Sequence, residues 1–193
     1  MEQNDILKNE FSALSEAVKT AKHEYHSFSF ATLRLNKPEI RTVILREIDN
    51  QKNTIAFHSD IRSSKLDDIK MNNNVSALFY DKVRRIQLRI NGEASIDKGS
   101  PKLKSSWDAM KPESKLCYMG PYAPSKELNS FLVNLPNHNA QNISAKSDAL
   151  GYSRFCKITI KIKSMDWLHL KHTGHERLLF SFDKKITSKW IAS

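Results

Sequence analysis

The sequence predicts a mainly β fold with flanking helices (α+β), in which about six to eight mostly antiparallel strands form a small barrel. Two observations lead to this prediction. Apolar and polar residues alternate over several short segments, and turn-forming residues separate these segments at close spacing. The five glycines form neither GxGxxG nor GxxxxGK[ST], which excludes the glycine-rich phosphate loops of parallel α/β folds.

The expected elements follow in order along the chain. Within residues 1–24, apolar residues at helical spacing predict a helix over residues 5–22. We expect strands over residues 28–35, 41–48, 54–59, 75–80, 84–96, 153–163, 167–171 and 177–182. A short helix is expected over residues 64–71. Gly92, inside a long strand, indicates a bulge or a close backbone approach.

Residues 101–151 differ in character from the strands around them. Pro101 and Pro112 can each begin a helix. Residues 120–151 have little periodicity and are rich in Pro, Asn and Ser. A long irregular stretch inside a compact domain is typical of a functional segment. We therefore predict a helical and irregular insertion near the functional site, and leave its role open.

Length and composition limit the class of protein. The 193 residues are enough for one domain with a substantial core, so we expect a single domain over residues 1–193. Apolar residues make up 39% and charged residues 27%, as in soluble globular proteins. We see no apolar run of membrane-spanning length and no signal-peptide pattern. We expect a cytoplasmic protein that does not contact a membrane.

The net charge of +10 fits three kinds of partner: nucleic acid, an anionic surface or a phosphorylated small molecule. The basic residues are spread along expected strands and helix starts rather than gathered in a tail. They are not interleaved with aromatic residues, as they are in many single-strand binders. The pattern makes nucleic acid an improbable partner.

Cysteine and histidine positions give no sign of a metal site. Cys117 and Cys156 lack metal-ligand spacing and are expected to be free, buried thiols. The cluster of His169, His172 and His175 has no matching cysteine or acidic partners. We predict no metal.

A phosphate-binding role is the first hypothesis from the basic residues between Arg41 and Lys65. Residues 62–65 combine Arg, two Ser and Lys where the short helix begins, and helix N-termini attract phosphate. An ordinary capped helix is the alternative. Arg41 and Arg46 would lie on opposite faces of a regular strand, roughly 16 Å apart, which favours two anionic groups or one elongated ligand.

Gln87 raises a second possibility for ligand binding. It shares an expected strand face with Arg85 and Arg89, so it is not expected in the core. It either belongs to a plain solvated face or offers its amide to a flat heterocycle.

Taken in order, these segments resemble the pyridoxamine 5′-phosphate oxidase family of FMN-binding split β-barrels. The matching motifs are F-x-x-A-T-x-R at 28–34, R-x-V-x-L-R at 41–46, F-x-S-x-x-x-S-x-K at 57–65, a Gln-bearing strand at 87–94, and W-L-x-L with H-x-R at 167–177. No single motif is specific, whereas their order and spacing together are.

The resemblance implies a homodimer with FMN at the subunit interface and a small-molecule substrate, phosphorylated or not. It assigns the cofactor to eleven residues: Arg41, Val43, Ile44, Leu45, His58, Ser59, Ser64, Lys65, Gln87, Trp167 and Arg177. Among them, Arg41 and Lys65 would bind the FMN phosphate and Gln87 the flavin ring. On the substrate side it places Arg46 and His175. It identifies no catalytic residue.

One departure limits what the resemblance implies. Where the family's oxidases have Arg in R-L-H-x-R, this chain has Thr173 in T-G-H-E-R. FMN binding survives this loss better than vitamin B6 oxidation does. We therefore expect an FMN-binding flavoprotein, an oxidoreductase related to pyridoxamine 5′-phosphate oxidase. The alternatives are an FMN-dependent reductase of another substrate and a non-catalytic flavin- or haem-binding protein of the same fold.

Overall fold

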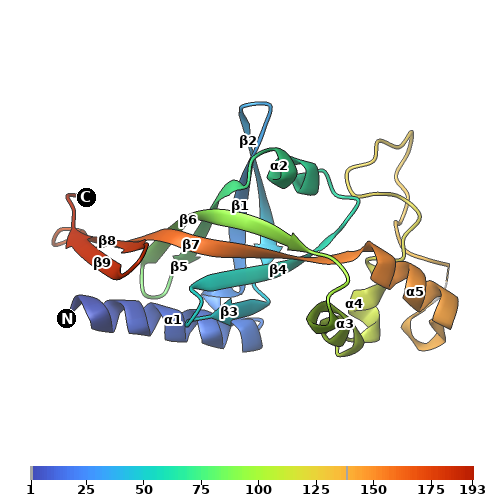
Figure 1. Cartoon of the computed structure of the whole chain (residues 1–193), viewed down its shortest axis with the longest axis horizontal. Helices are drawn as coiled ribbons and strands as arrows, with labels where there is room; N and C mark the ends of the chain where they lie inside the picture. The colour runs from blue at the N-terminus through green and yellow to red at the C-terminus, as the bar shows by residue number, and fades with distance from the viewer. Residues whose placement is uncertain (1, 138) are drawn as a thin grey trace. The chain divides into compact units, whose positions relative to one another are not determined.

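The computed structural model describes residues 2–137 and 139–193. Within these residues, the chain forms five α-helices and one nine-stranded, mostly antiparallel sheet that does not close into a complete barrel (Figure 1). The predicted fold class, mainly β with flanking helices, is confirmed. The strand count exceeds the expected range because short strands were not anticipated, among them β3 and β9.

The α-helices are α1 (Gln3–Lys19), α2 (Lys65–Met71), α3 (Pro101–Asp108), α4 (Pro112–Leu116) and α5 (Ala145–Arg154). Two short 3₁₀ helices are η1 (Glu24–His26) and η2 (Ala140–Asn142). The strands are β1 (Ser27–Arg34), β2 (Lys37–Ile44), β3 (Glu47–Asp49), β4 (Thr54–Asp60), β5 (Asn74–Asp81), β6 (Ile86–Asp97), β7 (Phe155–His169), β8 (Glu176–Phe182) and β9 (Ile186–Trp190). The strand order is β2-β1-β5-β6-β7-β4-β3, with β8 on β7 and β9 on β8.

The chain forms two compact units. The first comprises residues 2–57, 68–95 and 159–193, and the second comprises residues 58–67 and 96–158. The first unit therefore holds α1 and most of the sheet, and the second holds α3, α4 and α5. Each unit is described by itself below.

Aromatic side chains form much of the core of the first unit. Phe28 stacks on Phe79 with ring centroids 4.5 Å apart, and Phe30 meets Phe57 edge-on at 4.8 Å. Helix α1 adds a buried face that consists of Ile6, Leu7, Glu10, Phe11, Leu14 and Ala17. The helix is present as predicted, but it ends at Lys19 rather than near residue 22.

The expected strand 41–48 is two strands. β2 begins at Lys37, pairs with β1 and ends at Ile44, and β3 pairs separately with β4. Leu35 and Asn36 both have positive φ, which allows a tight two-residue turn into β2. Arg41 and Arg46 therefore do not share one regular strand, and the separation expected for such a strand does not apply to them.

Gly92 meets the backbone of β7 at close range. A Cβ at this position would lie 2.3 Å from the carbonyl oxygen of Lys161, a distance that no side-chain carbon can accept. The close approach predicted from the glycine is confirmed.

Strand β7 alternates as predicted only in part. Lys161 and Lys163 are exposed and Ile160 and Ile162 are buried, but Lys157 is only 5% exposed. Residues 155–158 are all buried, which indicates that the strand is covered on both faces there.

In the second unit, Trp107 lies at the centre of a small core with Leu103, Met119 and Phe155. The helices that begin at Pro101 and Pro112 are confirmed. The irregular stretch is shorter than predicted, because α5 begins after residue 144, where the side chain of Ser144 caps the helix.

The two cysteines differ from each other. Cys156 is buried, as expected, and burial raises the pKa of its thiol to about 12. Cys117 is exposed, so that prediction was wrong. Between residues 2 and 193, with residue 138 left aside, no helix is both long and apolar enough to cross a membrane.

Candidate functional site

Three polar side chains of the second unit gather around the start of α2. Lys65 Nζ donates hydrogen bonds to Ser63 Oγ at 2.5 Å and to Ser59 Oγ at 3.1 Å. Both serines are buried, with 6% of their surface exposed. An ammonium group held beside two hydroxyls offers a phosphate both positive charge and hydrogen-bond donors. We call Ser59, Ser63 and Lys65 the Ser-Ser-Lys cluster.

Arg62 lies between these residues in sequence but has other partners. Its guanidinium donates to both carboxylate oxygens of Asp60, at 2.7 Å from Nη2 and 3.0 Å from Nε, and its backbone N–H donates to the same carboxylate. Its Nη1 donates to the carbonyl oxygen of Gly120 at 3.2 Å. The sequence predicted that Arg62 helps to bind a phosphate. The structure gives this prediction no support, because the guanidinium of Arg62 already binds Asp60 and Gly120.

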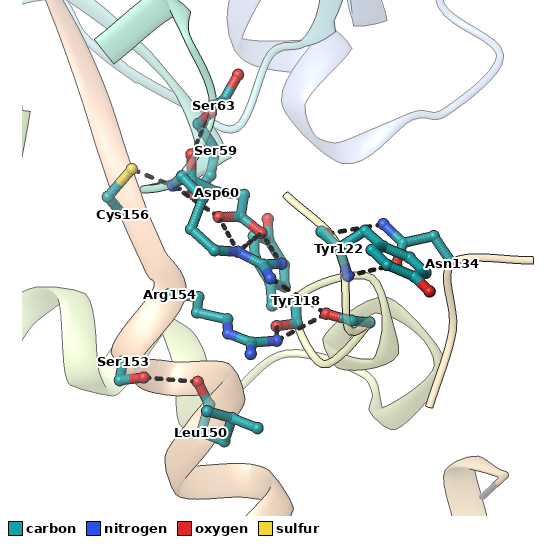
Figure 2. A network of polar contacts seen from close by, with 12 residues as sticks. Ser59, Asp60, Ser63, Tyr118, Tyr122, Asn134, Leu150, Ser153, Arg154 and Cys156 are labelled. Carbon is teal, nitrogen blue, oxygen red and sulfur yellow. Dashed lines mark hydrogen bonds and ion pairs between the residues drawn. The ribbon is translucent and has the colours of Figure 1, made fainter. Parts of the chain in front are cut away.

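A second arginine donates to the same carbonyl. Arg154 Nη1 lies 2.7 Å from the oxygen of Gly120 and 3.2 Å from that of Tyr118 (Figure 2). Burial and the nearby positive charge of Arg62 lower the pKa of Arg154, and Asp60 opposes this. Arg62 and Arg154 can both donate to the carbonyl of Gly120 because the negative charge of Asp60 offsets their repulsion.

The backbone around the Ser-Ser-Lys cluster is fixed by β7. Cys156 Sγ donates to the carbonyl oxygen of Ser59 at 3.2 Å (Figure 2). The N–H of Ile61 donates to the carbonyl of Arg154 at 2.7 Å. His58 meets the ring of Phe155 edge-on at 4.7 Å. Ser64 is half-buried immediately before α2.

In the first unit, Arg41 is oriented by its neighbours on the sheet. Its Nη1 donates to Thr32 Oγ1 at 2.7 Å and to the carbonyl of Glu39 at 3.0 Å, and Asp68 lies 3.7 Å from Nη2. Burial lowers the pKa of Arg41, although Asp68 opposes this. Burial also opposes the ionisation of Asp68, but hydrogen bonds from Arg34 and Thr32 outweigh it and hold its pKa low.

The residues that follow Arg41 differ in what they can offer a ligand. Val43 and Ile44 are half-buried on β2, whereas the side chain of Leu45 is fully buried. No part of Leu45 is therefore accessible to a ligand in this structure. Arg46 is exposed between β2 and β3, and its backbone N–H donates to Ala56 at 2.8 Å.

Gln87 lies on the outward face of β6. It is half-buried between the buried Ile86 and Leu88, and it pairs with the exposed Tyr80 of β5. Arg89 follows on the same face. This position suits a side chain that contacts a ligand laid over the sheet.

Arg177 belongs to an ion-pair cluster on β6, β7 and β8. It donates to both oxygens of Asp166, at 3.0 Å from Nε and 2.7 Å from Nη2, and Arg89 donates to the same carboxylate. Asp166 is only 6% exposed. Burial opposes its ionisation, but the hydrogen bonds from Arg177 and Arg89 lower its pKa.

Trp167 faces the opposite side of β7 from Asp166, because neighbouring residues of a strand alternate. It is 4% exposed and its indole Nε1 donates to Glu10 at 3.2 Å. Glu10 also accepts from Arg84, twice at 3.0 Å, and from Tyr25 at 3.0 Å. Trp167 lines a cavity of about 460 Å³ in the first unit, together with Trp190 and other residues of α1, β7 and β8.

His175 is exposed in the turn between β7 and β8, where its Nδ1 accepts from the N–H of Lys171 at 3.2 Å. Gly174 there has a φ of 115°, which a glycine adopts easily. Among the described residues, no group of three or more His, Cys, Asp or Glu is placed to hold a metal.

The predicted site residues thus fall into two sets. The second unit holds His58, Ser59, Ser64 and Lys65, and the first unit holds Arg41, Val43, Ile44, Leu45, Arg46, Gln87, Trp167, His175 and Arg177. Sequence reasoning missed Glu10 and Asp166, the acids that hold Trp167 and Arg177. A signal for Glu10 was present, because it lies three residues after Leu7 and one before Phe11 on the apolar face of α1.

Part of the chain matches the model of a known protein family. Residues 8–98 match the family model described as pyridoxamine 5′-phosphate oxidase, FMN-binding domain. These residues are similar to that domain. The match confirms FMN as the cofactor, while the residues that bind it remain predictions.

Relatives match over longer stretches. The chain is 27% identical over 175 residues to pyridoxine/pyridoxamine 5′-phosphate oxidase 2 of Arabidopsis thaliana, covering 86% of this chain and 84% of that protein. It is 26% identical over 187 residues to pyridoxine/pyridoxamine 5′-phosphate oxidase of Pelagibacter ubique, covering 93% and 86%.

Solved structures show the same fold. A pyridoxamine 5′-phosphate oxidase-related, FMN-binding protein from Nostoc punctiforme has a TM-score of 0.73 at 20% identity, over 94% of this chain and 96% of its own. PhzG from Burkholderia lata, solved with tetrahydrophenazine-1-carboxylic acid, has a TM-score of 0.67 at 16% identity, over 100% and 93%.

The donor chemistry of this chain fits FMN. The Ser-Ser-Lys cluster can bind a phosphate monoester through one ammonium group and two hydroxyls. Gln87, on the outward face of β6, carries an amide that can both donate to and accept from a flavin ring.

Proposed function

We propose that this protein is an FMN-dependent oxidoreductase related to pyridoxamine 5′-phosphate oxidase. The observation that carries the proposal is the Ser-Ser-Lys cluster inside the segment that matches the FMN-binding domain. The relatives named as pyridoxine/pyridoxamine 5′-phosphate oxidases support the oxidoreductase class.

In this proposal, the chain positions the cofactor and its charges. Lys65, Ser59 and Ser63 of the second unit bind the phosphate. In the first unit, Thr32 and Glu39 hold the guanidinium of Arg41, the other cation that the family resemblance assigns to the phosphate. Bound FMN supplies two-electron redox chemistry, by taking a hydride from a reduced substrate and passing electrons to an acceptor such as dioxygen.

The substrate side differs from that of a vitamin B6 oxidase. Thr173 and Gly174 form the tip of an exposed turn, and His175 beside them is exposed as well. Arg46 is exposed and bears the one charge that the family resemblance assigns to substrate. We propose a small anionic substrate that Arg46 binds, and weak or absent turnover of pyridoxamine 5′-phosphate.

We also propose that the protein is a homodimer. Apolar side chains are exposed on the sheet of the first unit, among them Ile40 at 67%, Tyr80 at 46% and Leu78 at 37%. Tyr80 lies directly opposite Gln87, so a partner that covers these residues would border the proposed flavin position. Light scattering on the eluting protein tests this, and a monomer at micromolar concentration would contradict it.

The experiment that tests the function begins with the visible spectrum of the purified protein, with and without added FMN. Flavin absorbance and saturable FMN binding are expected. A Soret band without flavin binding would instead support the haem-binding alternative. The bound flavin is then reduced chemically and its reoxidation by dioxygen is followed.

Turnover of pyridoxamine 5′-phosphate, measured as peroxide release, separates the substrates. FMN binding and reoxidation without this turnover are expected. Turnover at the rate of an efficient oxidase would contradict the proposed difference in substrate. A flavin that binds but cannot be reduced and reoxidised would support a non-catalytic flavin-binding protein.

A further inference from the structure

The segment from Gly120 to Asn134 is closed at its base. The side chain of Asn134 accepts from the N–H of Tyr122 at 3.0 Å and donates to its carbonyl at 2.9 Å (Figure 2). A Cβ on Gly120 would lie 2.3 Å from the carbonyl oxygen of Asn134. We call residues 120–134 the closed loop, a compact form of loop that is frequently functional.

The closed loop exposes large apolar side chains immediately before Asn134. Phe131 is 89% exposed and Val133 is 64% exposed, with Leu132 between them at 51%. A loop whose base is fixed while its large apolar side chains are exposed can change its order without unfolding the domain.

The base of this loop is tied to the Ser-Ser-Lys cluster through two arginines. Arg154 and Arg62 both donate to the carbonyl of Gly120. Arg62 in turn grips the carboxylate of Asp60, and the N–H of Ser63 donates to the carbonyl of Asp60 at 3.0 Å. A displacement of residues 60–63 therefore reaches Gly120 through hydrogen bonds alone.

The backbone of Arg154 also makes a hydrogen bond in this region. Its carbonyl accepts from the N–H of Ile61, while its guanidinium holds Tyr118 and Gly120. One residue thus contacts both the strand end that leads into the cluster and the base of the closed loop. Arg62 pairs with the carboxylate of Asp60, whose charge also acts on Arg154. Lys65 adds a third cation five residues after Asp60, and a phosphate dianion would balance this excess of positive charge.

We propose that Arg154 is a positioning residue that couples phosphate binding at the Ser-Ser-Lys cluster to the order of the closed loop. This rests on the proposed function, in which the phosphate is that of FMN. The coupling is reciprocal: FMN orders the loop, and a disordered loop weakens FMN by the same factor.

Limited trypsin digestion tests the coupling, because Lys126 is exposed in the closed loop. The rate of cleavage after Lys126 is measured with no ligand, with FMN and with riboflavin, which lacks the phosphate. FMN is expected to slow cleavage of the wild-type protein by about 5- to 150-fold, the usual range of coupling, and riboflavin to slow it much less.

The matched variants are Arg154→Gln and Lys146→Gln, the second at an exposed position of α5. Protection by FMN is expected to disappear in Arg154→Gln, with a corresponding loss of FMN affinity, and to persist in Lys146→Gln. Equal protection by FMN in wild type and Arg154→Gln would overturn the proposal. So would FMN binding to wild type without any protection.

A second variant keeps the test decisive if Arg154→Gln does not fold. Asn134→Ala opens the base of the loop and touches none of the residues of the Ser-Ser-Lys cluster. If the closed loop and the phosphate site are coupled, Asn134→Ala lowers the affinity for FMN. Unchanged affinity would overturn the proposal. If wild type binds no FMN, the proposed function fails but the coupling can still be tested with inorganic phosphate. Coupling then predicts that phosphate protects wild type from cleavage and does not protect Asn134→Ala.

Discussion

Arg41 and Thr32 are joined by a hydrogen bond of 2.7 Å between Nη1 and Oγ1. They lie on the neighbouring strands β2 and β1, so the guanidinium is oriented by the sheet before any ligand binds. A pre-oriented donor loses less conformational entropy on binding than a free surface arginine does. This makes Arg41 the predicted cofactor ligand of the first unit whose role is easiest to test.

Replacing Arg41 with alanine is expected to weaken FMN binding by about 1.5–3 kcal/mol, the range for hydrogen bonds to charged groups. Flavin fluorescence titration measures it. Arg34→Ala is the matched control, because Arg34 also pairs with Asp68 but has no assigned role at the cofactor. If both variants lose the same affinity, the effect comes from Asp68 and not from a phosphate contact.

Lys65→Met separates phosphate binding from ring binding. Loss of the ammonium group beside Ser59 and Ser63 is expected to reduce FMN affinity by about 1.5–3 kcal/mol and to leave riboflavin affinity nearly unchanged. Titration with both flavins measures the difference. A parallel loss for riboflavin would mean that Lys65 supports the fold of the site and not the phosphate.

Glu10→Ala tests how much the buried carboxylate that binds Trp167 contributes to stability. The carboxylate is buried and accepts from Arg84, Tyr25 and Trp167, so its removal leaves three donors without their acceptor. We expect a loss of about 2–4 kcal/mol in the free energy of unfolding. This loss is smaller than that for breaking a fully buried ion pair, because Arg84 retains its ion pair with Asp81 and is partly exposed.

Urea denaturation followed by tryptophan fluorescence measures this loss. Lys8→Ala, at an exposed position of the same helix, is the control and is expected to change stability little. An equal effect of the two substitutions would show that α1 contributes through its length and not through Glu10.

The sequence predicted regular elements well where one local pattern decides them. The helix of residues 3–19, the proline-started helices and the close approach at Gly92 follow from periodicity, capping and the lack of a side chain. Leu45 and Arg46 show where such patterns fail. Both continue an alternating run, but the strand ends before them because β2 and β3 pair with different partners.

The same limit applies to the candidate site. Lys65 and its serines are close in sequence, so their convergence could be anticipated. The contact of Arg62 with Gly120 was not anticipated, because Gly120 is remote in the chain and no local pattern reports its carbonyl. Asp166 was missed for a similar reason, since Arg89 and Arg177 reach it from two other strands.

Asp166 gives a prediction about acid stability. Arg177 and Arg89 hold its pKa below the ordinary value, so the folded state releases this proton more readily than the unfolded chain does. A carboxylate of this kind stabilises the fold above its unfolded pKa, about 3.9, and the contribution is lost as pH falls from there through the lower folded pKa. Wild type is therefore expected to exceed Asp166→Asn in stability near neutral pH, with a difference that shrinks below about pH 4.

Urea denaturation of both proteins between neutral pH and pH 3 measures that difference. Asp183→Asn, at an exposed position of the first unit, is the control and should follow wild type at every pH. A gap between wild type and Asp166→Asn that stays constant down to pH 3 would show that the carboxylate contributes through packing and not through its charge. Because Arg177 is a predicted cofactor ligand, Asp166→Asn is also expected to weaken FMN binding at neutral pH, where the ion pair is intact.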